Sequence, residues 1–258
     1  MGVVNVTPDS FSDGGINLDP ANAVRTARAM VADGAALVDV GGESTRPGSD
    51  GVSVDEELRR VVPVLEQLAG AVAISIDTAK AEVARRAIAL GAVLVNDVTA
   101  LRGDREVVGV VADAGVDLCL MHMQGEPRTM QLDPHYDDVV ADVKRFLEER
   151  LAFAVDHGVA EERICLDPGI GFGKTVEHNL ELLRRLPELA ALGRPLVVGF
   201  SRKRSLGRLL GDPDATTGPL FASVTAAVLA YERGATILRV HDVRETVEAL
   251  TIASAVAR

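Results

Sequence analysis

The chain of 258 residues contains no tryptophan, only 3% aromatic residues and only two cysteines. Because aromatic side chains are scarce, the core has to be built from Val, Leu, Ala and Ile, and a hydrophobic share of 47% is enough for a large one. The two thiols, Cys119 and Cys165, both lie in apolar runs. We therefore expect buried, unpaired cysteines and a reducing, cytoplasmic setting.

Long apolar runs and an excess of positive charge are also missing. No run of about 18 apolar residues is present, and the first residues lack the basic and apolar regions of a signal peptide, so we expect no membrane span and no export signal. The net charge of −11 argues against nucleic acid or an anionic membrane as a partner. A phosphate-bearing substrate would need a local cluster of basic residues.

Short apolar runs that are typical of buried strands alternate along the whole chain with segments of helical spacing. Strands that are apolar on both faces predict a parallel sheet. Eight strand–helix units predict that this sheet closes into one α/β domain, a (β/α)8 TIM barrel over residues 1–258. An open doubly wound sheet is the alternative, but it does not need eight evenly spaced units.

The expected strands are Gly2–Asn5, Leu37–Val40, Val72–Ile76, Val93–Asn96, Asp117–Met121, Ile164–Asp167, Leu196–Gly199 and Ile237–Val240. The expected helices are Ala21–Asp33, Val54–Leu68, Lys80–Leu90, Arg105–Ala114, Tyr136–His157, Asn179–Leu186, Pro219–Arg233 and Val243–Ala257.

Polar side chains follow the carboxyl end of every expected strand, which is where barrel enzymes place their active sites. A barrel with a purely structural role would have no reason to collect them at one rim. They are Asn5, Glu43–Arg46, Asp77, Asn96 with Asp97, His122, Asp167, Ser201–Lys203, and Arg239 with His241.

Two glycine-rich loops on this rim, Thr7–Gly15 and Gly41–Gly48, are longer than a simple connection needs. We expect them to act as lids over the site. Their side chains with expected partners are Phe11, Asp13, Thr45 and Arg46. A third segment, Gly169–Thr175, resembles a P-loop, but it is one residue too short and follows the sixth strand, so we expect no ATP site.

Eight segments in the same order are similar to the motifs of dihydropteroate synthases, and the similarity covers nearly the whole chain. The resemblance implies a transferase in which p-aminobenzoate displaces pyrophosphate from 6-hydroxymethyl-7,8-dihydropterin pyrophosphate, giving 7,8-dihydropteroate for folate synthesis. It also implies Mg²⁺ as a cofactor, competition by sulfonamides, and a homodimer formed through helices late in the chain. The segments are Asn5–Gly15, Gly41–Gly48, Ser75–Thr78, Asn96–Val98, Met121–Gly125, Asp167–Lys174, Ser201–Lys203 and Arg239–Val243.

The residue types in these segments suit a pterin. A pterin edge presents an amino group beside a ring N–H, and a carboxylate such as Asp167 can accept both. Asn96 carries a donor and an acceptor for the remaining edge, and Lys203 can reach the pterin carbonyl or a ring nitrogen. Asp77 would support positive charge as the pterin methylene loses its leaving group. The apolar residues expected in the pterin site are Val98, Met121 and Phe172.

The departing pyrophosphate is strongly negative and needs cations nearby. Arg239 and His241, two residues apart, are expected on one side of the last strand. Arg46 from the second loop and Asn5 complete the expected pyrophosphate site. Because Mg²⁺ prefers oxygen ligands and keeps several waters, Asn5 and Asp13 are its candidate contacts. The expected contacts of p-aminobenzoate are Phe11, Thr45, Arg46, Lys203 and Arg204, and the expected catalytic residues are Asp13, Arg46, Asp77 and Lys203.

We expect a dissociative substitution in which pyrophosphate departs early and no covalent bond to the protein forms. Three alternatives remain: a methyltransferase acting between a reduced folate and a corrinoid protein, a pterin-binding barrel without turnover, and a barrel that serves only in interactions. The basic residues after the last two strands favour pyrophosphate chemistry. One departure from the family pattern is Ser205, which stands where an aromatic or large apolar residue is usual behind the p-aminobenzoate pocket.

Overall fold

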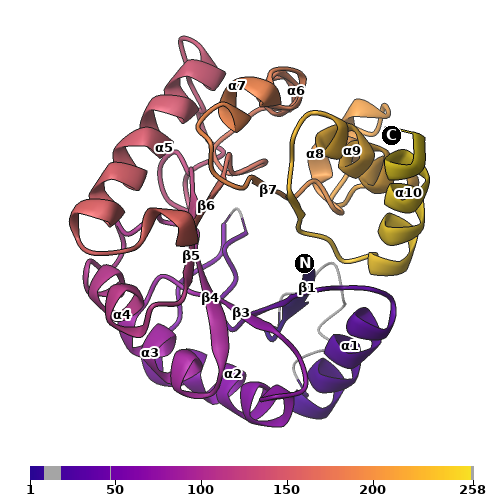
Figure 1. The fold of residues 1–258 in the computed structure, drawn as a ribbon. Helices are drawn as coiled ribbons and strands as arrows, with labels where there is room; N and C mark the ends of the chain where they lie inside the picture. Colours follow the sequence, from indigo (N-terminus) through magenta and orange to yellow (C-terminus); the bar gives the residue numbers. More distant parts are fainter. Residues whose placement is uncertain (9–18, 47, 257–258) are drawn as a thin grey trace.

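The computed structural model describes residues 1–8, 19–46 and 48–256 and shows a ring of parallel strands surrounded by helices (Figure 1). Strands β1 to β6 form one sheet in chain order, and β7 pairs with β8. The strands are β1 (Gly2–Asn5), β2 (Val38–Gly41), β3 (Ile74–Asp77), β4 (Ala92–Asp97), β5 (Asp117–Met121), β6 (Ile164–Asp167), β7 (Val197–Val198) and β8 (Ile237–Leu238).

The helices lie outside this ring, and most of them connect one strand to the next. They are α1 (Pro20–Ala32), α2 (Val54–Leu68), α3 (Ala81–Ala89), α4 (Glu106–Ala114), α5 (Val139–Asp156), α6 (Val176–Arg184), α7 (Leu186–Ala190), α8 (Arg204–Leu209), α9 (Leu220–Glu232) and α10 (Val243–Val256), with a 3₁₀ turn at Glu161–Arg163 before β6. Among the described residues, no helix is both long enough and apolar enough to cross a membrane.

Two single bridges join the β7–β8 pair to the larger sheet and close the ring. On one side, Leu166 of β6 pairs with Leu196. On the other side, Gly2 of β1 pairs with Val240, whose backbone N donates to Met1 O at 2.9 Å. The predicted eight-stranded barrel is thereby confirmed, and the open doubly wound sheet is wrong because its edge strands would not meet.

A small apolar cluster fills the interior of the barrel. It contains Leu94, Cys119, Cys165 and Val197, each 5% exposed or less, with Met1 packed against them. These four residues come from the consecutive strands β4 to β7, and Met1, just before β1, reaches them from the other side of the ring, so the cluster lies inside the barrel. Both cysteines are unpaired and buried, as expected. A much larger cluster of Val, Leu, Ile and Ala joins the outer face of the strands to the helices.

Element boundaries differ from the prediction where polar side chains cap helices. The expected helix over Tyr136–His157 begins at Val139, because the Asp138 carboxylate accepts from two backbone N–H groups of the first turn. The expected helix over Asn179–Leu186 is two helices, α6 and α7, with Pro187 in the first turn of the second. Ala257, the expected end of the last helix, lies outside the described residues.

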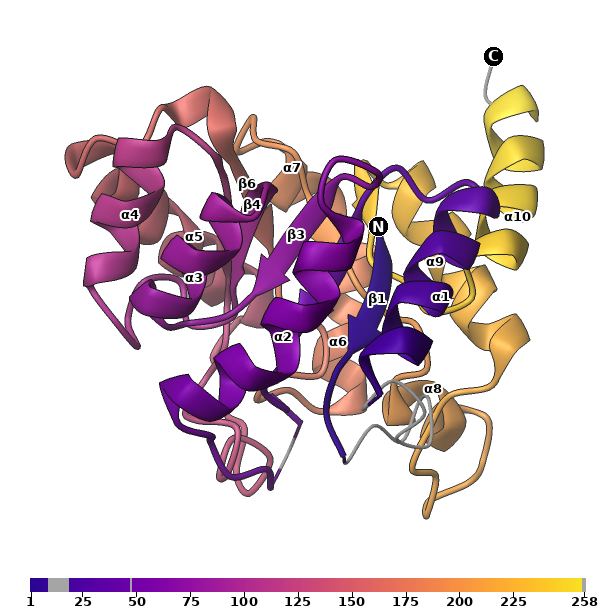
Figure 2. The same ribbon diagram turned by 90° about the horizontal axis from the view of Figure 1, so that it is seen from below.

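The short helix α8 was not expected, since six residues are too few to show a periodic apolar stripe. It lies on the side of the barrel to which the arrowhead of β1 points (Figure 2). This is the carboxyl end of the parallel strands, and the long loops that follow β2 and β5 also lie there. The fold therefore delivers the residues after each strand to one mouth.

Candidate active site at the barrel mouth

A cavity of about 760 Å³ opens at the carboxyl ends of the strands. Its walls come from the ends of β1 and β3 and from the segments after β2, β5, β6, β7 and β8. The predicted site residues in its lining are Asn5, Thr45, Arg46, Asp77, Phe172, Lys203, Arg204, Arg239 and His241. Residues that are far apart in the sequence thus meet at the predicted rim. Phe11 and Asp13 of the first glycine-rich loop lie outside the described residues.

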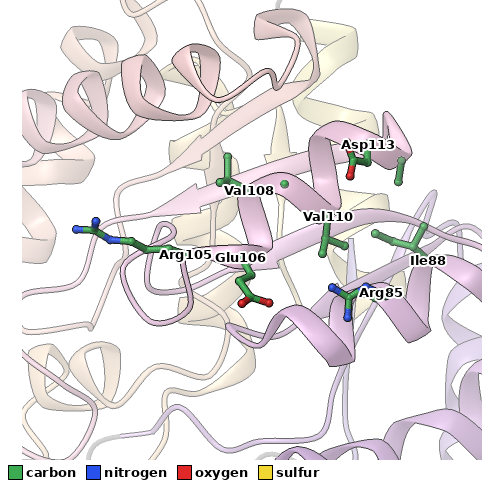
Figure 3. A pocket seen from close by; sticks show the side chains of 9 residues that line it. Arg85, Ile88, Arg105, Glu106, Val108, Val110 and Asp113 are labelled. Atoms are coloured by element: carbon green, nitrogen blue, oxygen red, sulfur yellow. The ribbon is translucent and has the colours of Figure 1, made fainter.

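A second hollow, of about 630 Å³, lies on the outer surface between α3 and α4 (Figure 3). Its lining includes Arg85, Glu106 and Asp113 beside Ile88 and Val110. These residues come from two neighbouring helices and not from the strand ends. A hollow of this kind lacks the polar groups converging from several elements that active sites have, so we place the candidate site in the barrel mouth.

Arg239, just after β8, lies between two buried carboxylates. Its Nε donates to Asp39 Oδ2 at 2.7 Å, and its Nη2 donates to Asp77 Oδ2 at 2.8 Å. Asp39 also accepts from Ser75 Oγ at 2.5 Å and from Asn96 Nδ2 at 3.1 Å. Because hydrogen bonds to charged groups are strong and directional, this network fixes Asp77 and Asn96 in place.

Asp39 was not predicted as a site residue. It is fully buried within β2, two residues before Gly41, and it faces the barrel interior. The available signal was a charged residue inside an otherwise apolar strand, since such a residue almost always has a partner. Burial raises the pKa of Asp77, and the charge of Arg239 opposes this rise. The ionisation of Asp77 therefore depends on Arg239 staying where Asp39 holds it.

Asp167 and Lys203 bring opposite charges to the other side of the mouth. Asp167 Oδ1 accepts from Gly169 N at 2.7 Å, and burial raises the pKa of Asp167 while that N–H and the charge of Lys203 lower it. Burial lowers the pKa of Lys203 to about 8, with Arg239 adding to this effect and Asp167 opposing it. Lys203 Nζ lies 4.3 Å from the centroid of the Phe172 ring. Such shifted groups in a cavity are typical of functional sites.

An apolar cluster adjoins this charged pair. Val98, Met121, Met123 and Met130 are buried together, and Phe172 packs against them. The structure thus brings together all three predicted apolar residues, Val98, Met121 and Phe172, and adds two methionines that were not predicted. Four predicted pterin residues do not reach the cavity lining and are only 3–6% exposed, namely Asn96, Val98, Met121 and Asp167.

His241 lies close to Ser201. Ser201 Oγ and His241 Nδ1 are 3.1 Å apart, and the backbone N of His241 donates to the same Oγ at 3.0 Å. Burial, together with the charges of Arg239 and Arg202, lowers the pKa of His241 to about 3. His241 is therefore neutral in the ligand-free protein. A bound anion among these cations would favour its protonated form.

His122 was predicted at the rim, but its side chain is buried beside the loop after β6 and does not line the cavity. Its ring packs edge-on against Phe146, with centroids 4.8 Å apart, and its Nδ1 accepts from Lys174 Nζ at 2.8 Å. Lys174 Nζ also donates to the carbonyl oxygens of Gly169 and Phe172, both at 3.0 Å. Three acceptors match the three N–H groups of an ammonium, and together they fix the loop after β6.

Asp97 also turns away from the cavity, although it was predicted at the rim. Its Oδ1 accepts from Thr99 N and Thr99 Oγ1, both at 2.7 Å, and its Oδ2 accepts from Leu101 N at 2.8 Å. The carboxylate therefore shapes the turn after β4. Asn96, its neighbour in the strand, faces the opposite way, toward Asp39.

The second glycine-rich loop is bonded to its surroundings at both ends. Arg60 Nη1 of α2 donates to Gly42 O at 2.9 Å, and Gly48 N donates to Pro127 O at 3.0 Å.

Ser205, on α8, also lines the cavity, and its buried hydroxyl has no hydrogen-bond partner in the part of the chain that the structure describes. Within the same described ranges, no three His, Cys, Asp or Glu side chains meet as a metal site.

Comparisons with known proteins agree on one family. A family profile described as "Pterin binding enzyme" matches residues 1–241. The dihydropteroate synthase of Escherichia coli K12 is 49% identical over 260 residues, covering 99% of this chain and 90% of that protein. Two solved structures extend the similarity to the fold.

The first is the Yersinia pestis dihydropteroate synthase in a sulfonamide drug complex. It has a TM-score of 0.94 and 47% identity, covering 100% of this chain and 93% of that one. The second is the Xanthomonas albilineans dihydropteroate synthase in complex with 7,8-dihydropteroate. It has a TM-score of 0.87 and 48% identity, covering 100% of this chain and 92% of that one.

Gly169 allows the loop after β6 to pass close to the loop after β5. It has a φ of +67°, and a Cβ there would lie 1.8 Å from His122 O, whereas Gly193 has a φ of +74° and nothing within 4 Å of a Cβ. We expect Gly193→Ala to lower the free energy of unfolding by about 1 kcal/mol, and Gly169→Ala to lower it by about 3 kcal/mol or more. Denaturant unfolding measures both losses, and equal losses would contradict the close approach.

His122 should make stability depend on pH. Burial lowers its pKa from 6.5 to about 2, so between these values the unfolded chain binds a proton that the folded protein does not. Its contribution to stability is therefore full above about pH 6.5 and is lost as the pH falls. We expect His122→Gln to reduce the slope of unfolding free energy against pH by about 1.4 kcal/mol per unit between about pH 4 and 6. The exposed His135→Gln is the control, and an equal slope in both variants would contradict the assignment.

Proposed function

The chain belongs to the dihydropteroate synthase family of pterin-binding enzymes, and from this premise we propose how its barrel mouth works. It is a transferase of folate synthesis that joins 6-hydroxymethyl-7,8-dihydropterin pyrophosphate to p-aminobenzoate, giving 7,8-dihydropteroate and pyrophosphate. The observation that carries the proposal for the site is the set of polar residues at the strand ends, in which the buried Asp77, Asn96 and Asp167 lie with the half-buried Lys203.

The pterin binds to this set in the proposal. Asp167 uses one oxygen for Gly169 N–H, so its other oxygen and remaining lone pairs are available for the amino group and the ring N–H of the pterin. Asn96 donates to Asp39, which leaves its amide oxygen for the same edge. Lys203 supplies a donor to the pterin carbonyl or a ring nitrogen. The apolar cover consists of Val98, Met121 and Phe172.

The substitution itself is dissociative in the proposal. The bond between the pterin methylene carbon and the pyrophosphate oxygen breaks, and its electron pair leaves with pyrophosphate. The lone pair of the p-aminobenzoate nitrogen then forms the new C–N bond, and the nitrogen loses a proton to solvent. Asp77, held beside Arg239, stabilises the positive charge on the methylene between these events. No protein nucleophile is needed.

The proposed pyrophosphate site consists of Asn5, Arg46, Arg239 and His241, all of which line the cavity. Arg239 is already paired with two carboxylates, so its charge belongs to the fixed wall of the site. Arg46 approaches from the second loop. His241 is neutral without a ligand, so it accepts a proton or donates a hydrogen bond once the anion arrives.

We propose that Mg²⁺ binds together with pyrophosphate and not in a cage of protein ligands. Asn5 lines the cavity, and its amide oxygen is a possible ligand atom for the ion. Among the described residues, no three acidic, Cys or His side chains meet. Mg²⁺ commonly keeps several waters and takes substrate phosphate oxygens as ligands. Asn5 and Asp13 would hold the ion or its waters. When bound, the ion neutralises charge on the leaving group.

The proposed p-aminobenzoate site lies between the second loop and α8. Thr45, Arg46, Lys203 and Arg204 line this part of the cavity, and Phe11 of the first loop is proposed to join them. Burial lowers the pKa of Arg204, and the nearby charge of Arg208 lowers it further. A carboxylate bound here would relieve that repulsion. This gathering of basic groups favours an acidic arylamine substrate over the methyltransferase alternative.

Asp167→Ala should abolish pterin binding, because the pterin edge loses two charge-assisted hydrogen bonds. We expect the affinity for a pterin ligand, measured by calorimetry, to fall by at least about 100-fold. The control is Asp117→Ala, which removes a half-exposed carboxylate at the first residue of β5 and so at the other end of the barrel. Normal pterin affinity in Asp167→Ala would remove the central assignment.

The reaction itself is checked by giving the wild-type protein 6-hydroxymethyl-7,8-dihydropterin pyrophosphate, with and without p-aminobenzoate. The pyrophosphate released from this substrate is measured. Release that needs p-aminobenzoate supports the synthase. No release under either condition would indicate a pterin-binding barrel without turnover.

We propose a cytoplasmic homodimer in which residues 1–258 form one domain. The unpaired, buried thiols of Cys119 and Cys165 suit a reducing compartment.

The dimer uses α9 and α10, which lie side by side (Figure 1). On them Phe221, Ile252 and Val256 are 83%, 68% and 81% exposed. Large exposed apolar side chains on neighbouring helices are typical of protein interfaces.

Phe221→Glu should convert the dimer into a monomer, because a charge would have to be buried in the apolar interface. Analytical ultracentrifugation measures the mass of the wild type, of this variant and of Leu132→Glu. Leu132 is 81% exposed in the loop after β5 and serves as the control. A wild-type monomer, or an unchanged dimer in Phe221→Glu, would rule out this interface.

A further inference from the structure

Lys80 joins three separate segments from outside the cavity. It stands at the N-terminal boundary of α3 and does not line the cavity. Its Nζ bonds to the carboxylate of Glu43, in the second glycine-rich loop, and to the carboxylate of Glu57, in the first turn of α2. A single ammonium thus ties that loop to the helix that follows it and to the segment after β3.

Glu43 is the point at which this tie reaches the site. It lines the cavity two residues before Thr45, and its Oε2 also accepts from Val52 N at 3.2 Å. The preceding residue, Gly42, lies so close to α2 that a Cβ there would be 2.7 Å from Val61 Cγ1. The base of the loop is therefore seated on α2 by both contact and charge.

The charges of the cluster make Lys80 hard to replace. The side chain of Glu57 is 1% exposed, against 24% for Lys80 and 26% for Glu43. Burial lowers the pKa of Lys80, but the hydrogen bonds to Glu43 and Glu57 outweigh it and raise the pKa. Glu57 Oε1 has no hydrogen-bond partner among the described residues. Without Lys80, a buried carboxylate would therefore lack its counter-charge.

The proposed pterin residues are held by a different set of contacts. Asp77 and Asn96 are fixed through Asp39 and Arg239, and Asp167 through the backbone of Gly169. These contacts run between strand ends and do not pass through Glu43. The charge of Glu57 does contribute to raising the pKa of Asp77. The second loop and the pterin site nevertheless have separate sets of hydrogen bonds.

We propose that Lys80 is a positioning residue for p-aminobenzoate. It holds Glu43 and thereby sets the place of Thr45 and Arg46 in the mouth, while the pterin site forms without it. This inference rests on the proposed role of the second loop in the reaction.

The test uses Lys80→Met combined with Glu57→Gln, so that no unpaired buried carboxylate remains and the barrel can fold. We expect the KM for p-aminobenzoate to rise about tenfold, and the Kd of a pterin ligand to change by less than about twofold. Glu43→Ala should give the same split, since it removes the other end of the bridge. In Lys80→Arg, the KM for p-aminobenzoate should return most of the way to the wild-type value. Arg85→Ala, which removes an exposed ion pair with Glu82 on α3, is the control.

Two outcomes would overturn the inference. The first is an unchanged KM for p-aminobenzoate in the double variant, and the second is a rise in this KM that is matched by an equal rise in the Kd of the pterin ligand. The second would mean that Lys80 serves only general stability. Hydrogen exchange of residues 42–52 gives a readout that needs no turnover, and the double variant should lose protection there. If the wild type makes no dihydropteroate, the proposed function fails, while unchanged exchange in this segment would still refute the role of Lys80.

Discussion

The pairing of Arg239 with Asp39 and Asp77 is the interaction on which the barrel mouth depends. It links the end of β8 to β2 and β3, between residues that are 200 and 162 positions apart. β7 and β8 join the rest of the sheet through one bridge on each side, and this ion pair adds a connection between side chains across the closure. Because a buried charge without its partner is strongly destabilising, the closed ring and the arrangement of the site are coupled.

Two lysines extend the same principle to the loops around the mouth. Lys174 gathers two backbone oxygens and His122 beneath the loop after β6, and Lys80 gathers two carboxylates beneath the loop after β2. Lys174 is buried and Lys80 is partly buried, and the amino group of each contacts hydrogen-bond acceptors from several segments at once. The loops that carry Phe172 and Thr45 are in this way tied to the barrel, although they contain many glycines.

Pterin recognition and leaving-group departure place different demands on this framework. The buried polar set at the strand ends suits a flat, neutral ligand whose hydrogen bonds must all be matched. The outer part of the mouth collects basic side chains. Burial lowers the pKa values of Lys203 and His241, and repulsion from the neighbouring cations acts in the same direction. An anion arriving there relieves this repulsion, so binding of the charged groups and assembly of the outer site reinforce each other.

The sequence by itself predicted the barrel and the order of its strands, because eight evenly spaced strands that are apolar on both faces favour a closed parallel sheet over an open one. It also placed Asp77, Lys203 and Arg239 at the mouth, since the residues after parallel strands must share one rim. Only the tertiary structure decided which way each rim side chain turns. His122 and Asp97 follow strands as the others do, yet their partners, Lys174 and the Thr99 turn, draw them away from the cavity.

The charged partners of Arg239 and Lys80 also could not be predicted from the sequence. The spacing of residues along one strand predicts on which face of the sheet each side chain lies. Which carboxylates become the counter-charges, here Asp39, Glu43 and Glu57, depends on which segments the closed ring brings into contact. Local pattern therefore determined where the active site lies. Long-range packing decided which charges hold it in shape, because electrostatic partners are chosen by proximity in space and not by position in the chain.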